Sequence, residues 1–358
     1  MGGIWRRLVL VALCALMAAT GPALAQTGST GTFEGLVDVG GYRLFLRCTG
    51  QGGPTVVLDA GVGFTADAWG GVQPSVAGFT RVCSYDRAGT GRSEFGPVPR
   101  TSRTMVGDLR TLLRNAGVPG PYVLVGHSLG GLNMNLYARL YPSEVAGVVL
   151  VDAMPANIID RFAQVATPEQ VHYAYPYPGE IPEGVDFRGS VAEVQTAPPF
   201  PNVPLLVLVR TDWTFWNPPG FPIDEFARIW NELSVADARM SPRGAVLFVD
   251  GASHMIHWDR PNVVIAAIRR VVNAARGLPT HTPGDFDGNG TTDIAVFRPG
   301  SGAWFVRNGV TVFWGTSGDV PVPGDYDGNG TTDIAVFRPG TGTWFLHGGA
   351  AVQWGASE

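Results

Sequence analysis

The stretch around Ser128 has the residue types and spacing of a nucleophile on a sharp turn. Residues 126–130 read Gly-His-Ser-Leu-Gly, the pattern G-x-S-x-G. An apolar run at 122–125 predicts a buried strand, and leucines at four-residue intervals afterwards predict a helix. Glycines must flank such a strained turn, because side chains there would clash. An ordinary serine in a Gly-rich loop is the alternative, but this context favours Ser128 as a nucleophile.

A serine nucleophile needs a base, and the base needs an acid that orients it. His254 directly follows an expected strand and turn, which favours it as the base. His257, three residues later, is the rival. His127, beside Ser128, is expected to be structural.

Two aspartates satisfy the chain order nucleophile, acid, histidine. Asp152 ends the apolar run 145–151, and Asp212 follows the later run 204–209. A hydrogen-bonded loop cap is the alternative for either residue, so the order rule alone leaves the acid open.

Composition narrows the class of protein. The 358 residues are 45% hydrophobic and 15% charged, which predicts a sizeable core and argues against disorder. The net charge is −5 and no basic run is present, so nothing favours nucleic acid or an anionic membrane as a partner.

The first 25 residues have the features of a secretory signal. Arg6 and Arg7 precede an apolar run at 8–19 that is too short to span a bilayer as a mature helix. Ala23-Leu24-Ala25 is an A-x-A cleavage site. We therefore expect a secreted protein, extracellular or periplasmic, without a mature transmembrane segment.

Three segments resemble the α/β-hydrolase superfamily, in particular secreted bacterial members of the esterase-like kind. They are P-G-P-Y-V-L-V-G-H-S-L-G-G, V-C-S-Y-D-R-A-G-T-G-R-S and V-V-L-V-D-A, and the similarity covers about residues 34–275. The resemblance implies an α/β-hydrolase domain at 26–277. Its fold would be a mostly parallel sheet with helices on both faces and a cap insertion at about 154–203.

The resemblance also bears on individual residues. It implies an oxyanion hole made by the Val62 and Leu129 N–H groups, although Ala60-Gly61 replaces the usual His-Gly pair and a plain strand-to-helix turn is the alternative. It favours Asp152 over Asp212 as the acid.

Removal of the signal leaves two cysteines, Cys48 and Cys83. In the fold that the resemblance implies, their strands are neighbours, so a disulfide is feasible. Two buried free thiols are the other possibility.

Two copies of one unit follow at 283–322 and 323–358, starting 40 residues apart. Each contains G-D-[FY]-D-G-N-G-T-T-D-I-A-V-F-R-P-G. The units resemble FG-GAP or VCBS-type repeats of secreted bacterial proteins, which implies a small all-β module.

Oxygen-bearing residues alternate along a Gly-broken loop in each copy, with the spacing of a calcium loop. The candidate ligands are Asp285, Asp287, Asn289, Thr291 and Asp293, then Asp325, Asp327, Asn329, Thr331 and Asp333. Turns stabilised by Asx hydrogen bonds without metal are the alternative.

The sequence as a whole favours a secreted serine hydrolase of the carboxylesterase or lipase kind, acting on a small-molecule ester or related acyl substrate. No cofactor is expected for catalysis. The alternative is an adhesion protein, in which the repeats bind a cell surface or polysaccharide and the hydrolase domain is secondary or inactive.

Overall fold

The computed structural model describes residues 31–181, 183–214, 220–278, 283–287, 292–307, 309, 311–326, 330–349 and 351–353. The predicted signal at 1–25 lies outside these residues. No helix within the described ranges has both the length and the apolar character that crossing a membrane requires.

The main sheet has eight strands. They are β1 (Phe33–Asp38), β2 (Arg43–Thr49), β3 (Thr55–Asp59), β4 (Val82–Tyr85), β5 (Tyr122–His127), β6 (Val145–Val151), β7 (Leu205–Arg210) and β8 (Gly244–Val249). Their order in the sheet is β1-β2-β4-β3-β5-β6-β7-β8. β2 pairs antiparallel with β1 and β4, whereas all pairs from β4 to β8 are parallel. The prediction of a mostly parallel α/β sheet is therefore confirmed.

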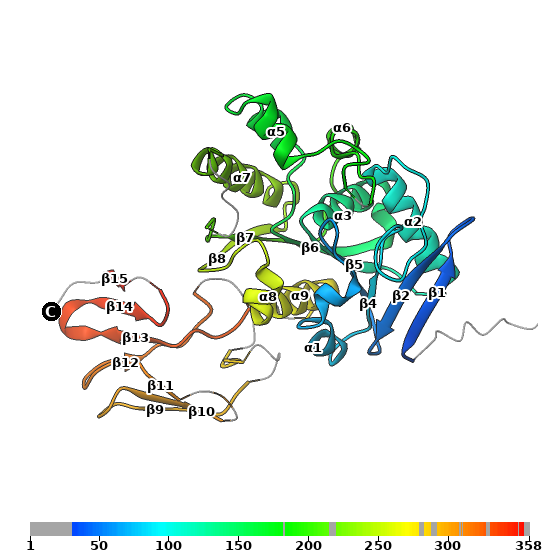
Figure 1. Ribbon diagram of the computed structural model, residues 1–358. Helices are drawn as coiled ribbons and strands as arrows, with labels where there is room; N and C mark the ends of the chain where they lie inside the picture. Colours follow the sequence, from blue (N-terminus) through cyan, green and yellow to red (C-terminus); the bar gives the residue numbers. More distant parts are fainter. Residues whose placement is uncertain are drawn as a thin grey trace, which may run out of the picture.

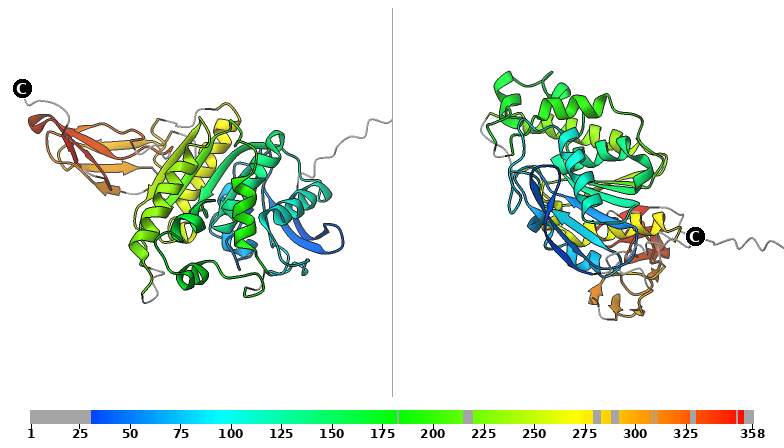
Figure 2. Two further views of the ribbon diagram at one scale, coloured as in Figure 1. Left: turned by 90° about the horizontal axis from the view of Figure 1, so that it is seen from above. Right: turned by 90° about the vertical axis from the view of Figure 1, so that its right-hand side faces the viewer.

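Helices cover both faces of this sheet (Figures 1 and 2). One apolar core includes buried residues of α2 (Ser102–Asn115), α3 (Leu129–Leu140) and α7 (Ile223–Ala238). The core on the other face includes α1 (Gln73–Ala77) and α9 (Pro261–Ala275). Because β3 to β7 are buried on both faces, they need the continuous apolar runs seen in the sequence.

Short helices complete the part of the molecule built around the main sheet. They are η1 (Ala66–Trp69), η2 (Pro142–Glu144), α4 (Ile158–Phe162), α5 (Pro168–Ala174), α6 (Phe187–Gln195) and α8 (Ile256–Asp259). Three of them, α4, α5 and α6, lie between β6 and β7, in the stretch where a cap insertion is expected. A capping box at Thr167 and Gln170 defines the start of α5.

Cys48 and Cys83 form a disulfide in this structure. The two residues are directly opposite each other in the antiparallel pair of β2 and β4. The bridge therefore joins the β1–β2 hairpin to the parallel part of the sheet.

The C-terminal module contains two small antiparallel sheets. Its elements are β9 (Ala295–Arg298), β10 (Ala303–Val306), β11 (Thr311–Phe313), β12 (Val320–Pro321), β13 (Ala335–Arg338), η3 (Pro339–Thr341), β14 (Thr343–Leu346) and β15 (Ala351–Gln353). The sheet orders are β11-β10-β9 and β12-β13-β14-β15. The module extends from the end of the molecule opposite β1 and β2 (Figures 1 and 2).

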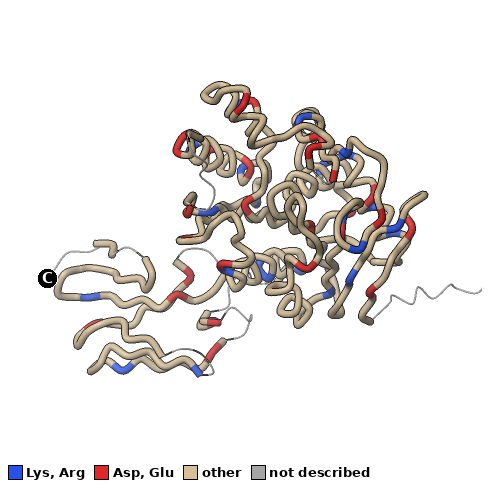
Figure 3. Tube along the Cα trace, viewed as in Figure 1, with Lys and Arg blue, Asp and Glu red and all other residues tan. Residues whose placement is uncertain are grey.

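Along the chain of the larger part, which holds the main sheet, Lys and Arg alternate with Asp and Glu (Figure 3).

Candidate active site

Ser128 occupies a strained turn between β5 and α3. Its backbone has φ 52° and ψ −119°, a conformation that L-residues rarely adopt. A Cβ at Gly126 would lie 2.4 Å from the carbonyl oxygen of Gly130, and one at Gly130 would lie 2.3 Å from the carbonyl oxygen of Asp59. Both glycines of the motif are therefore required by close backbone contact.

His254 and Asp152 form a hydrogen-bonded pair. The distance between His254 Nδ1 and Asp152 Oδ2 is 2.6 Å. Asp152 directly follows β6 and has φ 42°, and it and Ser128 are the only non-glycine residues with positive φ among those described. Such strain persists only where the surroundings impose it, and it concentrates at functional sites.

The Asp152 carboxylate is buried and held from three sides. Trp230 Nε1 donates to Oδ1 at 3.1 Å, the Arg210 N–H donates to the same oxygen at 3.3 Å, and Arg210 Nε lies 3.3 Å from Oδ2. Burial acts to raise the pKa of Asp152, but Arg210 and His254 outweigh it and the pKa is lowered. The carboxylate therefore stays ionised beside His254.

The carboxylate of Asp212, the alternative acid, makes only local hydrogen bonds among the described residues. Its Oδ1 accepts hydrogen bonds from the N–H and hydroxyl of Thr214, and none of its contacts reaches His254. Sequence reasoning missed Arg210 and Trp230, since nothing local marks residues 58 and 78 positions away as partners of Asp152.

His257, the rival base, packs inside the protein. Its ring is buried, lies 4.7 Å from the Trp69 ring and 4.5 Å from the His127 ring, and has no hydrogen-bond partner among the described residues. Burial lowers the pKa of His257 to about 3, and burial also lowers that of His127. Both rings are thus neutral neighbours of His254.

His127 is closer to the site than expected. Its ring lies 4.6 Å from that of His254, and its Nε2 is 2.9 Å from the His254 carbonyl oxygen. This contact supports the backbone of the loop that carries the base.

Ser128 and His254 are both partly accessible, and the His254 side chain is 25% exposed. The described structure has no hydrogen bond between the Ser128 hydroxyl and the imidazole. Contacts of this kind are commonly long before substrate binds and tighten in the reacting complex.

The loop after β3 lies against the nucleophile. A Cβ at Gly61 would be 3.3 Å from Ser128 Cβ and 2.8 Å from His127 Nδ1, so only glycine fits. The N–H groups of Val62 and Leu129 donate no hydrogen bond to any residue the structure describes. Two free donors thus flank the nucleophile at a helix N-terminus and a neighbouring loop.

Comparisons with known proteins agree with this architecture. The family model described as the alpha/beta hydrolase fold matches residues 52–199. The uncharacterized protein YqjL of Bacillus subtilis (strain 168) is 30% identical over 231 residues, covering 63% of this chain and 86% of that protein. The chain belongs to the α/β-hydrolase family.

Two further matches cover different shares of this chain. The hydrolase is 34% identical to "Putative carbamate hydrolase RutD" of Yersinia enterocolitica over 117 residues, or 31% of this chain and 41% of that protein. A solved structure described as a putative epoxide hydrolase from Pseudomonas aeruginosa covers 72% of this chain and 99% of its own, with 18% identity and a TM-score of 0.53. That likeness shows the fold alone.

The three cap tyrosines of the hydrolase have different environments. Tyr175 is buried and packs on Phe187, whereas Tyr173 and Tyr177 are exposed. Tyr175 belongs to the large hydrophobic core on one face of the main sheet. The other two are available to solvent.

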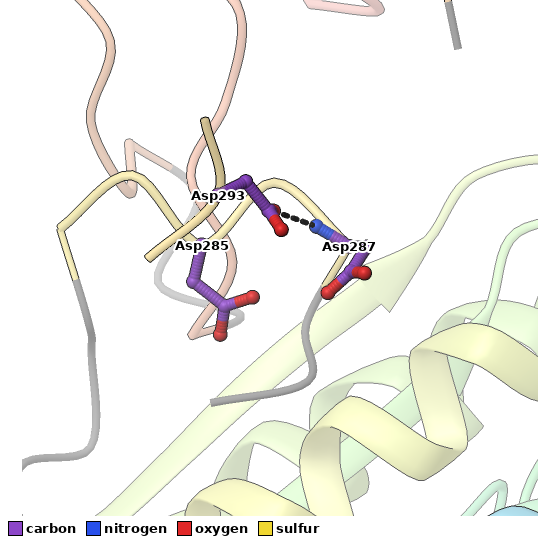
Figure 4. A group of neighbouring side chains, drawn as sticks. All are labelled: Asp285, Asp287 and Asp293. Atoms are coloured by element: carbon purple, nitrogen blue, oxygen red, sulfur yellow. Dashed lines mark hydrogen bonds between the residues drawn. The ribbon is translucent and has the colours of Figure 1, made fainter. Parts of the chain in front are cut away.

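The first acidic loop of the module brings three predicted ligands together (Figure 4). Ligand oxygens of Asp285, Asp287 and Asp293 all lie within 4.8 Å of one another, and Asp293 Oδ2 accepts the N–H groups of Phe286 and Asp287. Oxygens that share a calcium ion at about 2.3–2.6 Å are at most about 5 Å apart. This spacing therefore fits calcium. The predicted ligands Asn289 and Thr291 lie outside the described residues.

The second loop repeats part of this pattern. Asp333 Oδ2 accepts the Tyr326 N–H at 2.8 Å, and Asp325 Oδ2 accepts the Gly330 N–H at 3.0 Å. Thr331 is described, whereas Asp327 and Asn329 lie outside the described residues.

Proposed function

We propose that the protein is a serine hydrolase that cleaves carboxylic esters through an acyl-enzyme. The observation that carries this proposal is the hydrogen-bonded pair of Asp152 and His254. The segments that carry this pair contact the strained turn of Ser128, since the Met154 N–H donates to the Ser128 carbonyl at 3.0 Å and His127 Nε2 lies 2.9 Å from the His254 carbonyl oxygen. This arrangement has the parts of a nucleophile, a base and an orienting acid. Asp212 is not needed for this role.

The first step is attack on the acyl carbon by the Ser128 oxygen. His254 Nε2 accepts the hydroxyl proton while its Nδ1–H stays bonded to Asp152, which keeps the imidazole in the required tautomer. The carbonyl π electrons move to the oxygen. The N–H groups of Val62 and Leu129 would stabilise the resulting oxyanion.

Collapse of the tetrahedral intermediate breaks the bond to the leaving alcohol. His254 donates its proton to that oxygen, leaving an ester between Ser128 and the acyl group. Water then attacks this ester by the same route, with His254 again accepting and returning a proton. The products are an alcohol and a carboxylic acid.

The neutral state of His127 and His257 suits this cycle. Burial keeps both rings uncharged at neutral pH, so neither places a positive charge against the imidazolium that forms on His254. Arg210 Nε lies 3.3 Å from Asp152 Oδ2, the oxygen that also binds His254, and it helps to hold the acid in place.

The cellular setting is proposed from sequence features. The signal-like 1–25 segment and the disulfide between Cys48 and Cys83 support secretion into an oxidising compartment. The module would then bind calcium and attach the enzyme to a cell surface or polysaccharide. The first acidic loop, which gathers three carboxylates, supports the calcium part of this proposal.

The test of the function is hydrolysis of p-nitrophenyl esters of graded acyl length, with a p-nitrophenyl carbamate included. We expect Ser128→Ala to lower kcat by roughly 10⁴-fold or more, with thermal unfolding almost unchanged. A fluorophosphonate should label the wild-type protein on the peptide containing Ser128. Near-native turnover of the Ser128→Ala variant would exclude this mechanism, and inactivity of the folded wild type on every acyl substrate would favour the adhesion alternative.

A further inference from the structure

Arg87 lies at the centre of a buried network beside the loop of the proposed oxyanion hole. Its five N–H groups all have acceptors. Nη1 bonds Asp59 Oδ1 at 2.6 Å and the Ala60 carbonyl at 2.5 Å, and Nη2 bonds the Gly61 carbonyl at 2.6 Å. Nε and Nη2 bond the two carboxylate oxygens of Glu183 at 2.7 and 2.8 Å. The guanidinium and both carboxylates are buried.

These bonds fix the direction of the loop amides. In a trans peptide the N–H points away from the carbonyl of the preceding residue. With the Gly61 carbonyl held by Arg87, the Val62 N–H is directed to the opposite side. Glu183 Oε1 also accepts the Gly63 N–H at 2.5 Å, so the loop is held on both sides of Val62.

Glu183 belongs to the cap segment between α5 and α6, not to the sheet. This segment is attached to the hydrolase core next to Glu183, since the Arg100 N–H donates to the Gly184 carbonyl at 2.9 Å and the Asp186 N–H donates to the Arg100 carbonyl at 2.9 Å. The position of the Glu183 backbone is thereby defined.

A second chain of hydrogen bonds leads back to the cap through the nucleophile helix. Asp59 Oδ2 accepts from Asn133 Nδ2 at 3.0 Å, and Asn133 Oδ1 accepts from the Ser102 hydroxyl at 2.8 Å. The Ser102 N–H in turn donates to Ser190 Oγ of α6 at 2.9 Å. The circuit therefore connects the cap, the oxyanion loop and α3, which begins directly after Ser128.

We propose that Arg87 and Glu183 are positioning residues of the oxyanion hole, and that the cap thereby forms part of the catalytic apparatus. This inference rests on the proposed function. Neither side chain is placed to touch substrate. Glu183 acts through Arg87 and Gly63 on the direction of the Val62 N–H, so its removal should weaken transition-state stabilisation more than substrate binding.

Glu183→Gln is the informative variant. The carboxylate accepts three N–H groups on its two oxygens, whereas an amide of the same shape offers one oxygen and turns an NH₂ toward a donor. At least one of the bonds to Arg87 or Gly63 must therefore be lost. Arg87 keeps Asp59 as a partner, which favours folding of the variant.

We expect kcat for p-nitrophenyl acetate to fall by about 10- to 100-fold with KM within about two-fold, since full loss of one oxyanion donor costs about 10²–10³. A trifluoromethyl ketone, whose adduct on serine carries an oxyanion, should bind more weakly by the same factor as kcat/KM falls. Glu180→Gln is the matched control. This exposed cap residue caps a turn at Tyr177, and its substitution should leave both values unchanged.

Unchanged kcat in Glu183→Gln, or a raised KM with unchanged kcat, would overturn the inference. If Glu183→Gln does not fold, Glu183→Asp is used instead, since it keeps the charge but has a shorter side chain. We expect Glu183→Asp to lower kcat by a smaller factor, again with KM almost unchanged. Ser128→Ala, assayed alongside, separates this outcome from failure of the proposed function. If Ser128→Ala is inactive and Glu183→Gln behaves like the wild type, the positioning role is rejected and the proposed function stands.

Discussion

The hydrolase part and the C-terminal module use left-handed backbone in different ways. In the hydrolase part, Ser128 and Asp152 adopt positive φ although they carry side chains. In the described module, positive φ occurs only at glycines, such as Gly284 and Gly302. Strained side-chain-bearing residues therefore occur only in the region whose surroundings can impose them.

The packing of the two regions explains this contrast. The central strands of the hydrolase part are buried on both faces, whereas the module core consists of Trp304, Ile334 and Val336 with partly buried neighbours. Ile294 and Phe313 of the module are 62% and 73% exposed. A core this small offers little to hold a backbone in a strained state.

Carboxylates also differ between the two regions. Asp152 is buried and satisfied by donors from β7, α7 and the loop of His254. In the module, carboxylate oxygens of Asp285, Asp287 and Asp293 lie within 4.8 Å of one another. Contacts from other elements satisfy Asp152, whereas the module brings three carboxylates close enough to share one cation.

The largest expected effect is the loss of kcat when the proposed catalytic acid is replaced. We expect Asp152→Asn to lower kcat for p-nitrophenyl esters by about 10³–10⁴-fold, because the amide favours the wrong imidazole tautomer. Asp212→Asn should change kcat by less than about three-fold, since its contacts are confined to a local turn. Steady-state kinetics of both purified variants measure this difference.

A larger loss in Asp212→Asn than in Asp152→Asn would reverse the assignment. Circular dichroism of both variants distinguishes lost chemistry from lost folding.

A medium effect is expected on the pH dependence of stability. His257 has a folded pKa of about 3, below its ordinary value near 6.5, because it is buried. Between these values the unfolded chain binds a proton that the folded chain does not, so the free energy of unfolding falls as pH is lowered through this window. The decrease is on the order of a few kcal/mol near its acid end.

His257→Phe should flatten that slope when urea unfolding is followed between pH 7 and pH 4. The matched control is His347→Phe, at an exposed position of the module, which should leave the slope as it is. Identical slopes in wild type and His257→Phe would show that this ring is not a source of the acid sensitivity.

The smallest effect concerns calcium. We expect millimolar calcium to raise the unfolding temperature of the module in the full chain by several degrees relative to chelator, because a ligand bound only to the folded state stabilises it. Asp293→Asn should reduce this shift. Asp319→Asn is the control, since that carboxylate is engaged by Arg338.

Ester hydrolysis should be insensitive to these changes, and a chain ending at Gly277 should retain kcat within about two-fold. All proposed catalytic and oxyanion-hole residues and both hydrophobic cores of the hydrolase part precede that position. Identical unfolding with calcium and with chelator would refute the calcium proposal, and lost activity in the folded shorter chain would show that the module shapes the site.

Local features of the chain were predictable from sequence. The helix expected at 261–275 is α9, and the apolar run 145–151 is β6. The turn at Ser128 was also predictable, because only glycine fits at positions 126 and 130. A Cβ at Gly126 would clash with the nearby Gly130 carbonyl, and a Cβ at Gly130 would clash with the Asp59 carbonyl of the neighbouring strand.

The partners of these features required the tertiary structure. Which aspartate pairs with His254 depended on which strand end faces that residue, and the disulfide of Cys48 and Cys83 depended on strand register. Both aspartates satisfy the same order in the chain, so that order does not separate them, and only the family resemblance favoured Asp152.

The pairing of Arg87 with Glu183 shows most clearly what the sequence does not predict. The two residues are 96 positions apart, and although Arg87 lies in a segment that carries the family resemblance, nothing in the sequence pairs it with Glu183. Sequence by itself determined the strands, the helices and the turn that presents Ser128, because short-range sterics and apolar periodicity dictate them. Only the folded sheet and cap decided which charged side chains form pairs. A buried charge needs a partner, but partners that lie far apart in the chain cannot be recognised from the sequence.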